Sequence, residues 1–333
     1  MNKRLTALML ASLLTVTLAA GCSGSAKPSA KDASAPTDQN PHGEAPDIMQ
    51  GNVPPAPKPS VTQYPLTIKD GAGRDVTIAA EPKRVISVAP AITEMVFAIG
   101  KGDVLVGRGD LDDYPEAVKQ IPSVGGIVNL QFEKFVSLKP DLVLFTGGSE
   151  KVRDQLVNDY KLNVFVVDPK SFAGVTDAMI TLGQVLNSQE KAYAAVSEIA
   201  KQAQEIIRKV SQSTERPKVF YQVWDDPLMT AGNDTYLGDL IMLAGGINVA
   251  DDVNGWANYS LEQLQAKNPD IIITSTADGV AKVKAAKGWA GIRAVKEGKV
   301  FGVADPNLVS RPGPRLVQGL KWLAETLHPE LFK

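Results

Sequence analysis

Hydrophobic residues between positions 61 and 333 recur with two different spacings. Short apolar runs rich in β-branched residues, such as 85–88 and 164–167, alternate with longer segments whose apolar positions recur every three or four residues. The short runs predict buried strands and the longer segments predict amphipathic helices, an alternation typical of α/β folds with parallel sheets. Around a glycine turn, alternating apolar residues from Leu66 to Ile78 predict a β-hairpin. Further strands are predicted at 104–106, 142–145, 219–223, 271–273 and 300–303.

One sequence pattern occurs once in each half of this region. Glu133 matches Glu262 at an offset of 129 residues. The Pro-Asp pair ending at Asp141 matches the pair ending at Asp270 at the same offset. The shared offset favours two equivalent lobes. The alternative is that a helix, a Pro-Asp turn and a strand form a connection common to many α/β proteins.

Between the two halves, apolar positions recur at spacings of three and four residues over one long stretch. They predict a single helix at 188–213, about 37 Å long at a rise of about 1.5 Å per residue. One helix between two lobes permits only small hinge motions. We therefore predict an α/β protein with two Rossmann-like lobes, at 61–187 and 214–333, whose parallel sheets are joined by a single long rigid interlobe helix.

The first 60 residues have a different composition. Lys3 and Arg4 precede an apolar stretch, and small residues then lead to Cys22, the only cysteine of the chain. This arrangement predicts an export signal at 1–21, and it is similar to a bacterial lipoprotein processing site, which implies lipidation of Cys22. An ordinary secretory signal is the alternative. Residues 22–60 are rich in Pro, Ala and Ser, so we expect a disordered tether that holds the folded part at the outer face of the cytoplasmic membrane.

Composition and charge exclude several classes of partner. The 35 basic and 37 acidic residues give a net charge of −2 without a basic cluster, so no nucleic-acid partner is expected. Past residue 20 no apolar run approaches the ~20 residues that span a bilayer. His328 is the only histidine after residue 60, which disfavours haem ligation and a protein-held metal site.

The motifs of common enzymes are also missing from the sequence. It contains no Gly-x-Ser-x-Gly, phosphate loop or paired cysteines, so we expect no enzyme. A cleft hydrolase that uses Asp225 and Asp226 stays a remote alternative. A purely structural or adhesive surface lipoprotein is another.

Open α/β sheets bind ligands at the carboxyl ends of their strands, and two lobes would bring these ends to one cleft. The residues that follow the predicted strands combine aromatic faces with a few polar groups. Such a set suits a large, partly apolar ligand that carries acceptor or anionic groups. The predicted ligand-binding residues are Pro90, Ala91, Arg108, Tyr114, Trp224, Met229, Trp256 and Arg311.

Several motifs together resemble the substrate-binding proteins of ABC importers for vitamin B12 and ferric siderophores. They lie at 84–94, 113–115, 132–141, 244–249 and 259–264. The resemblance covers about residues 66–333 and implies a class III periplasmic-binding-protein fold. It also implies a monomeric receptor without a cofactor of its own, which takes up a chelate of cobalt or iron. The implied partner is an ABC permease dimer with its ATPase subunits.

The resemblance gives roles to two glutamates. In relatives, the glutamates that match Glu133 and Glu262 dock onto arginines of the permease. The alternative role is local, because a glutamate in the first turn of a helix complements the helix dipole. Ser260 and Gln263 are predicted to form a capping box at one of these helices.

For the ligand, the resemblance leaves two chelates open. Trp256 and Arg311 match the vitamin B12 binders, whereas Leu111 and Ile127 stand where those proteins carry aromatic residues. We predict a cobalamin or another corrinoid as the favoured ligand. The alternative is an anionic ferric siderophore bound by three arginines, namely Arg108, Arg311 and Arg315.

Overall fold

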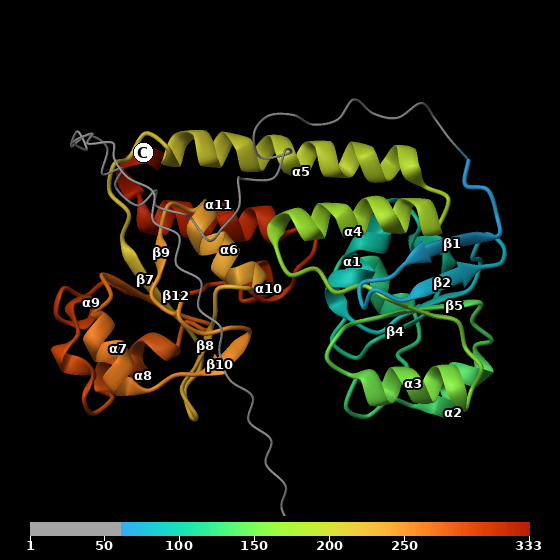
Figure 1. Cartoon of the computed structure of the whole chain (residues 1–333), viewed down its shortest axis with the longest axis horizontal. Coiled ribbons are helices and arrows are strands. Elements are labelled where there is room, and N and C mark those ends of the chain that lie inside the picture. The colour runs from blue at the N-terminus through green and yellow to red at the C-terminus, as the bar shows by residue number, and fades with distance from the viewer. Residues whose placement is uncertain (1–60) are drawn as a thin grey trace, which may run out of the picture. The chain divides into compact units, whose positions relative to one another are not determined.

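The computed structural model describes residues 61–333, which all belong to one compact unit. The predicted signal at 1–21, Cys22 and the tether at 22–60 lie outside the described residues. The described part contains two lobes with α/β architecture, as predicted (Figure 1). The predicted hairpin is present and consists of the antiparallel strands β1 (Leu66–Lys69) and β2 (Asp75–Ile78).

The sheet of the N-terminal lobe has four parallel strands in the order β4-β3-β5-β6. Side chains alternate between its two faces, so Leu142 and Leu144 of β5 enter one core while Val143 and Phe145 enter another. Burial on both faces explains why these strands read as continuous apolar runs. The elements are β3 (Val85–Ser87), α1 (Pro90–Ala98), β4 (Leu105–Arg108), α2 (Phe132–Ser137), β5 (Leu142–Phe145), α3 (Glu150–Asn158), β6 (Val164–Val166) and α4 (Phe172–Val185).

The sheet of the C-terminal lobe has the order β10-β8-β7-β11-β12, with β9 beside β7. Its strands β7, β11 and β12 are parallel, as predicted, and the short strand β9, which was not predicted, is parallel to β7. Residues 229–231 and 256–258 were not among the predicted strands, and they form the antiparallel strands β8 and β10. The strands are β7 (Lys218–Trp224), β8 (Met229–Ala231), β9 (Ile247–Asn248), β10 (Trp256–Asn258), β11 (Ile271–Thr274) and β12 (Val300–Gly302).

Helices cover both faces of this second sheet. One face contributes to the hydrophobic cluster that also contains residues of the first lobe. The opposite face packs against α7 and α8. Short 3-10 turns lie at Gly102–Val104, Glu116–Gln120, Trp289–Gly291 and Pro329–Phe332. The helices are α6 (Tyr236–Leu243), α7 (Leu261–Lys267), α8 (Gly279–Ala285), α9 (Arg293–Lys296), α10 (Asn307–Ser310) and α11 (Leu316–Leu327).

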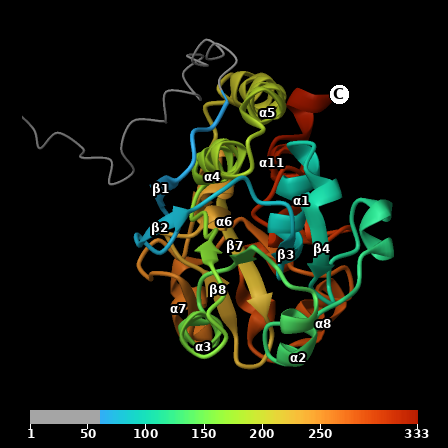
Figure 2. The same cartoon turned by 90° about the vertical axis from the view of Figure 1, so that its right-hand side faces the viewer.

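The helix predicted at 188–213 is α5, which runs from Gln189 to Val210 and extends along both lobes (Figure 1). Figure 2 shows the same helix end-on. Its apolar stripe packs against α4 of one lobe and α11 of the other. A single hydrophobic cluster continues from the strands of the first lobe through α4, α5 and α11 to the strands of the second. The lobes therefore share one core as well as one helix. Within residues 61–333, none of the helices has both the length and the apolar character that crossing a membrane requires.

Candidate functional site

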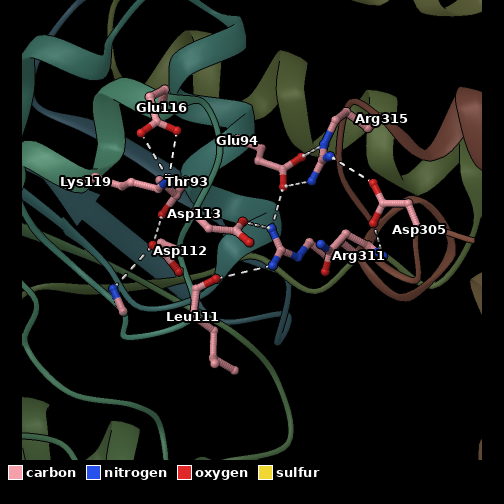
Figure 3. Close-up of polar contacts among 12 residues, drawn as sticks. Thr93, Glu94, Leu111, Asp112, Asp113, Glu116, Lys119, Asp305, Arg311 and Arg315 are labelled. Carbon is pink, nitrogen blue, oxygen red and sulfur yellow. Dashed lines mark hydrogen bonds and ion pairs between the residues drawn. The ribbon is translucent and has the colours of Figure 1, made fainter. Parts of the chain in front are cut away.

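A buried carboxylate on α1 connects the two lobes (Figure 3). Glu94 belongs to the N-terminal lobe, whereas Arg311 and Arg315 lie between α10 and α11 of the C-terminal lobe. Nε and Nη2 of Arg315 donate to the two oxygens of Glu94, at 2.8 and 2.7 Å, and Nη1 of Arg311 donates at 3.0 Å. Charge-assisted bonds of this kind are among the strongest hydrogen bonds in proteins. Glu94 therefore holds two arginines of the opposite lobe.

The loop after β4 adds further contacts to these arginines. Nη1 of Arg311 also donates to Asp113 at 2.6 Å, and its Nη2 donates to the backbone oxygen of Leu111 at 3.2 Å. The hydrogen bond from Arg311 lowers the pKa of Asp113. The guanidinium of Arg315 lies 4.3 Å from the ring centroid of Tyr114, which is a cation–π geometry. Arg311 and Arg315 of the other lobe therefore both hold this loop in place.

A second carboxylate of the same loop is buried beneath the site. Oδ2 of Asp112 accepts hydrogen bonds from the Thr93 hydroxyl and from the backbone N–H of Gly109, and Oδ1 has no hydrogen-bond partner within residues 61–333. Burial raises the pKa of Asp112 to about 6, because removal from water disfavours the charged form. The pKa of this carboxyl therefore lies well above that of an exposed aspartate.

The C-terminal lobe has a sheet face that carries two exposed tryptophans and a methionine. In the sheet register Trp224 pairs with Met229, which pairs with Asn258, and Trp256 lies two residues before Asn258. Paired residues on neighbouring strands share a face, so Trp224, Met229 and Trp256 project from the same side of the sheet. The irregularity between Gln222 and Trp224 brings Trp224 to this side. The two indoles are 60% and 46% exposed.

Tyr236 connects this apolar face to the charged cluster. The ring of Trp256 packs edge-on against Tyr236 at 5.5 Å, and the Tyr236 hydroxyl donates to the backbone oxygen of Ser310 at 2.8 Å. Ser310 immediately precedes Arg311. We call the ion-paired residues Glu94, Arg311, Arg315, Asp113 and Asp305 the interlobe cluster. The exposed Trp256 and this cluster therefore belong to one continuous region.

A pocket of about 230 Å³ lies at the carboxyl ends of β7 and β11. Gln222 lines it, and the buried Oε1 of Gln222 has no hydrogen-bond partner among the described residues. Lys282 donates to Asp225 at 3.0 Å, and this hydrogen bond lowers the pKa of Asp225. Asp225 is therefore an ion-paired carboxylate, which does not suit the general acid that a hydrolase would need.

The predicted ligand residues of the first lobe differ in what they contact. Tyr114 is exposed beside Arg315, as described above. Pro90 is the first residue of α1, and Ala91 is buried where α1 approaches Gly313. Arg108 donates to the backbone oxygens of Ile121 and Gly109, so its guanidinium stabilises the loops of its own lobe.

The sequence analysis missed the pairing of Glu94 with the arginines. The partners are more than 200 positions apart in the chain. The available signal was a carboxylate within the mostly apolar stretch 91–96, whose residues are all buried on α1. Nothing in the local pattern identified the cations that compensate it.

Glu133 and Glu262 lie in the first turns of α2 and α7, and both are exposed. The predicted capping box is present: Ser260 accepts the backbone N–H of Gln263 at 3.1 Å, and the Gln263 side chain accepts that of Ser260 at 3.2 Å. Since these two residues already cap α7, Glu262 is not needed as its cap.

Among residues 61–333, no three His, Cys, Asp or Glu side chains are grouped as a metal site. The family model for periplasmic binding proteins matches residues 85–306. The chain belongs to the periplasmic binding protein family.

Two curated relatives and one solved structure illustrate the range of this periplasmic binding protein family. The chain is 36% identical to an uncharacterized ABC transporter substrate-binding lipoprotein, YvrC, of Bacillus subtilis, over 81% of this chain and 88% of the relative. It is 27% identical to a cobalamin-binding protein of Halobacterium salinarum, over 80% of this chain and 74% of the relative. A crystal structure of a possible iron-binding (periplasmic solute-binding) protein from Staphylococcus epidermidis superimposes with a TM-score of 0.68 at 31% identity, over 75% of this chain and all of that one.

Proposed function

We propose that this protein is the extracytoplasmic substrate-binding lipoprotein of an ABC importer, and that it captures a metal chelate at the interlobe region. The observation that carries the proposal is the sheet face that Trp224, Met229 and Trp256 share, which the contact between Trp256 and Tyr236 connects to the interlobe cluster. Exposed indoles on one sheet face are suited to a large, partly apolar ligand. The relative named as an ABC transporter substrate-binding lipoprotein supports the same role.

A corrinoid is the favoured ligand. Its broad, largely apolar ring matches exposed aromatic faces, and one relative is named as a cobalamin-binding protein. A ferric siderophore is the second candidate, because the solved structure described as a possible iron-binding protein has a similar fold. In either case the metal arrives inside the chelate, and the protein carries out no reaction on it.

The proposed setting is the outer face of the cytoplasmic membrane, where lipidated Cys22 and the tether at 22–60 hold a monomeric receptor. The proposed partner is a permease dimer with its ATPase subunits. Glu133 and Glu262 would each dock on one half of the permease, because both are exposed, each on its own lobe. Complementary charge at such an interface mainly sets orientation and encounter rate.

Ligand binding is tested by titrating a soluble form beginning at Val61 with cyanocobalamin, cobinamide and ferric hydroxamate siderophores, while tryptophan fluorescence is recorded. We expect saturable quenching by corrinoids. Replacing Trp224 or Trp256 by Ala should weaken binding by about tenfold or more, the effect of losing ~1.4 kcal/mol of aromatic contact. The matched control is Phe301→Ala, which removes an exposed aromatic of the same lobe outside this region. If no chelate binds, the proposed function is wrong.

Permease docking has a separate test in cells. The double variant Glu133→Ala with Glu262→Ala should reduce ligand uptake severalfold while the purified protein keeps its affinity for the ligand. The control is Glu205→Ala, an exposed glutamate on α5. Unchanged uptake in the double variant would contradict the docking role.

A further inference from the structure

The interlobe cluster contains more negative than positive charge. Arg311 and Arg315 are its two cations, and Glu94, Asp113 and Asp305 each pair with one or both of them. With every group ionised, the cluster carries one excess negative charge. A cluster built to receive an anion would instead hold unpaired cations.

The carboxylates at the edge of the cluster are more exposed than its two arginines. Arg311 and Arg315 are only 12% and 14% exposed, whereas Asp113 and Asp305 are 53% and 46% exposed. A ligand that approaches the cluster therefore meets carboxylate oxygens before it meets guanidinium groups. Figure 3 shows that the carboxylate of Glu94 lies between the two guanidinium groups and accepts hydrogen bonds from both.

An anionic ligand would have to displace one of these carboxylates. If Glu94 lost its arginines, it would be a buried charge without a partner, which is strongly unfavourable. If the carboxylates stayed in place, the ligand anion would face like charge across the contact. A ligand without net negative charge requires neither change, because it leaves every ion pair intact.

We propose that the cluster of Glu94, Arg311, Arg315, Asp113 and Asp305 selects chelates without net negative charge and excludes polyanionic ones. This inference rests on the proposed function, whose substrate class it narrows. Glu94 acts through the arginines that it neutralises, so it is a positioning and specificity residue. A neutral corrinoid and a neutral ferric hydroxamate satisfy this selection, and a ferric tris-catecholate does not.

The test compares two ferric chelates that differ mainly in charge, with cyanocobalamin as a third, neutral probe. The full chain in detergent solution is titrated with a neutral ferric trihydroxamate and with a polyanionic ferric tris-catecholate, at low and at physiological salt. We expect the neutral chelate or cyanocobalamin to bind at least about tenfold more tightly than the catecholate. The Glu94→Gln variant should reduce this preference about tenfold, because it removes the charge that neutralises the two arginines.

Two further variants keep the outcome interpretable. Asp113→Asn removes a more exposed carboxylate of the cluster and should shift the preference in the same direction, even if Glu94→Gln fails to fold. Glu116→Gln is the matched control, since Glu116 pairs with Lys119 outside the cluster, and it should leave the preference unchanged. Equal or tighter binding of the catecholate to the native protein would overturn the inference alone, as would a preference that neither cluster variant changes. If none of the three probes binds, both the proposed function and this inference are wrong.

Discussion

At the scale of single residues, the region between the lobes is defined by carboxylates in very different surroundings. Glu94 is buried but fully compensated by Arg311 and Arg315. Asp112 is buried, and one of its oxygens has no hydrogen-bond partner in the described part of the chain. Glu94→Ala would remove an acceptor that two mostly buried arginines share, while Arg311 would keep Asp113 and Arg315 would keep Asp305. We therefore expect urea unfolding to show a loss of stability smaller than the ~3–5 kcal/mol of a buried charge left without any partner.

Asp112 makes stability depend on pH in a defined direction. In an unfolded chain an aspartate titrates near pH ~3.9, whereas burial raises the pKa of Asp112 to about 6 in the folded protein. Between these values the folded state binds more protons than the unfolded state, so this group's contribution to the free energy of unfolding falls as pH rises. Two pKa units correspond to about 2–3 kcal/mol.

We predict that Asp112→Asn removes the fall in the free energy of unfolding that ionisation of Asp112 causes as pH rises. In urea unfolding, the variant should gain about 2–3 kcal/mol relative to the native protein between about pH 4 and pH 7. The control is Asp103→Asn, which changes an exposed aspartate of the same lobe. Parallel stability curves for Asp112→Asn and the native protein would show that Asp112 does not titrate in this window.

Sequence reasoning reached some of these residues and not others. Tyr114, Trp224 and Arg311 were named because each follows a predicted strand, and parallel strands end at a common edge. Met229 and Trp256 were named as residues of connections, and they lie on the short antiparallel strands β8 and β10. The role of Glu94 was not accessible, because its partners come from a distant segment. Whether a charge is compensated depends on such long-range pairing, which no local spacing encodes.

At the scale of elements, helix spacing was the most reliable signal. The long apolar stripe predicted α5 to within a few residues of its ends. Strands β8 and β10 were not predicted, since they are three residues long and border a mainly parallel sheet. Short segments carry too few alternating positions for the pattern to separate a strand from a connection.

The contact between α4 and α5 depends on a small residue. A Cβ placed on Gly183 would lie 2.5 Å from Cβ of Ala192, so the two helices meet too closely for a larger side chain. Gly183→Val should destabilise the protein by about 1–3 kcal/mol through overpacking, measured by urea unfolding. Gly291→Ala is the control, because no atom lies within 4 Å of the added Cβ and its φ is not left-handed. Equal stability of both variants would contradict this account of the helix contact.

At the scale of the whole described part, the lobes are coupled in three ways. They share the helix α5, a continuous hydrophobic core and the interlobe charge cluster. Relative motion of the lobes would expose packed apolar surface or break buried ion pairs. We therefore expect ligand binding to cause only a small change in their spacing.

Distance measurements between spin labels test this expectation. A form beginning at Val61 has no cysteine, so Lys151→Cys and Lys284→Cys place one exposed label on each lobe. The distance distribution should be narrow without ligand and should shift by only a few ångströms when a saturating chelate is added. A broad distribution without ligand, or a shift typical of wide hinge closure, would show that the shared core does not restrain the lobes.

The most direct test of the central claim is a crystal structure of the protein with a bound corrinoid. The account predicts that the ring lies against Trp224, Met229 and Trp256 beside the loop that carries Tyr114, with Glu94 still paired to both arginines. A corrinoid bound elsewhere, with these aromatic side chains free in solvent, would contradict the claim that the interlobe region is the ligand site.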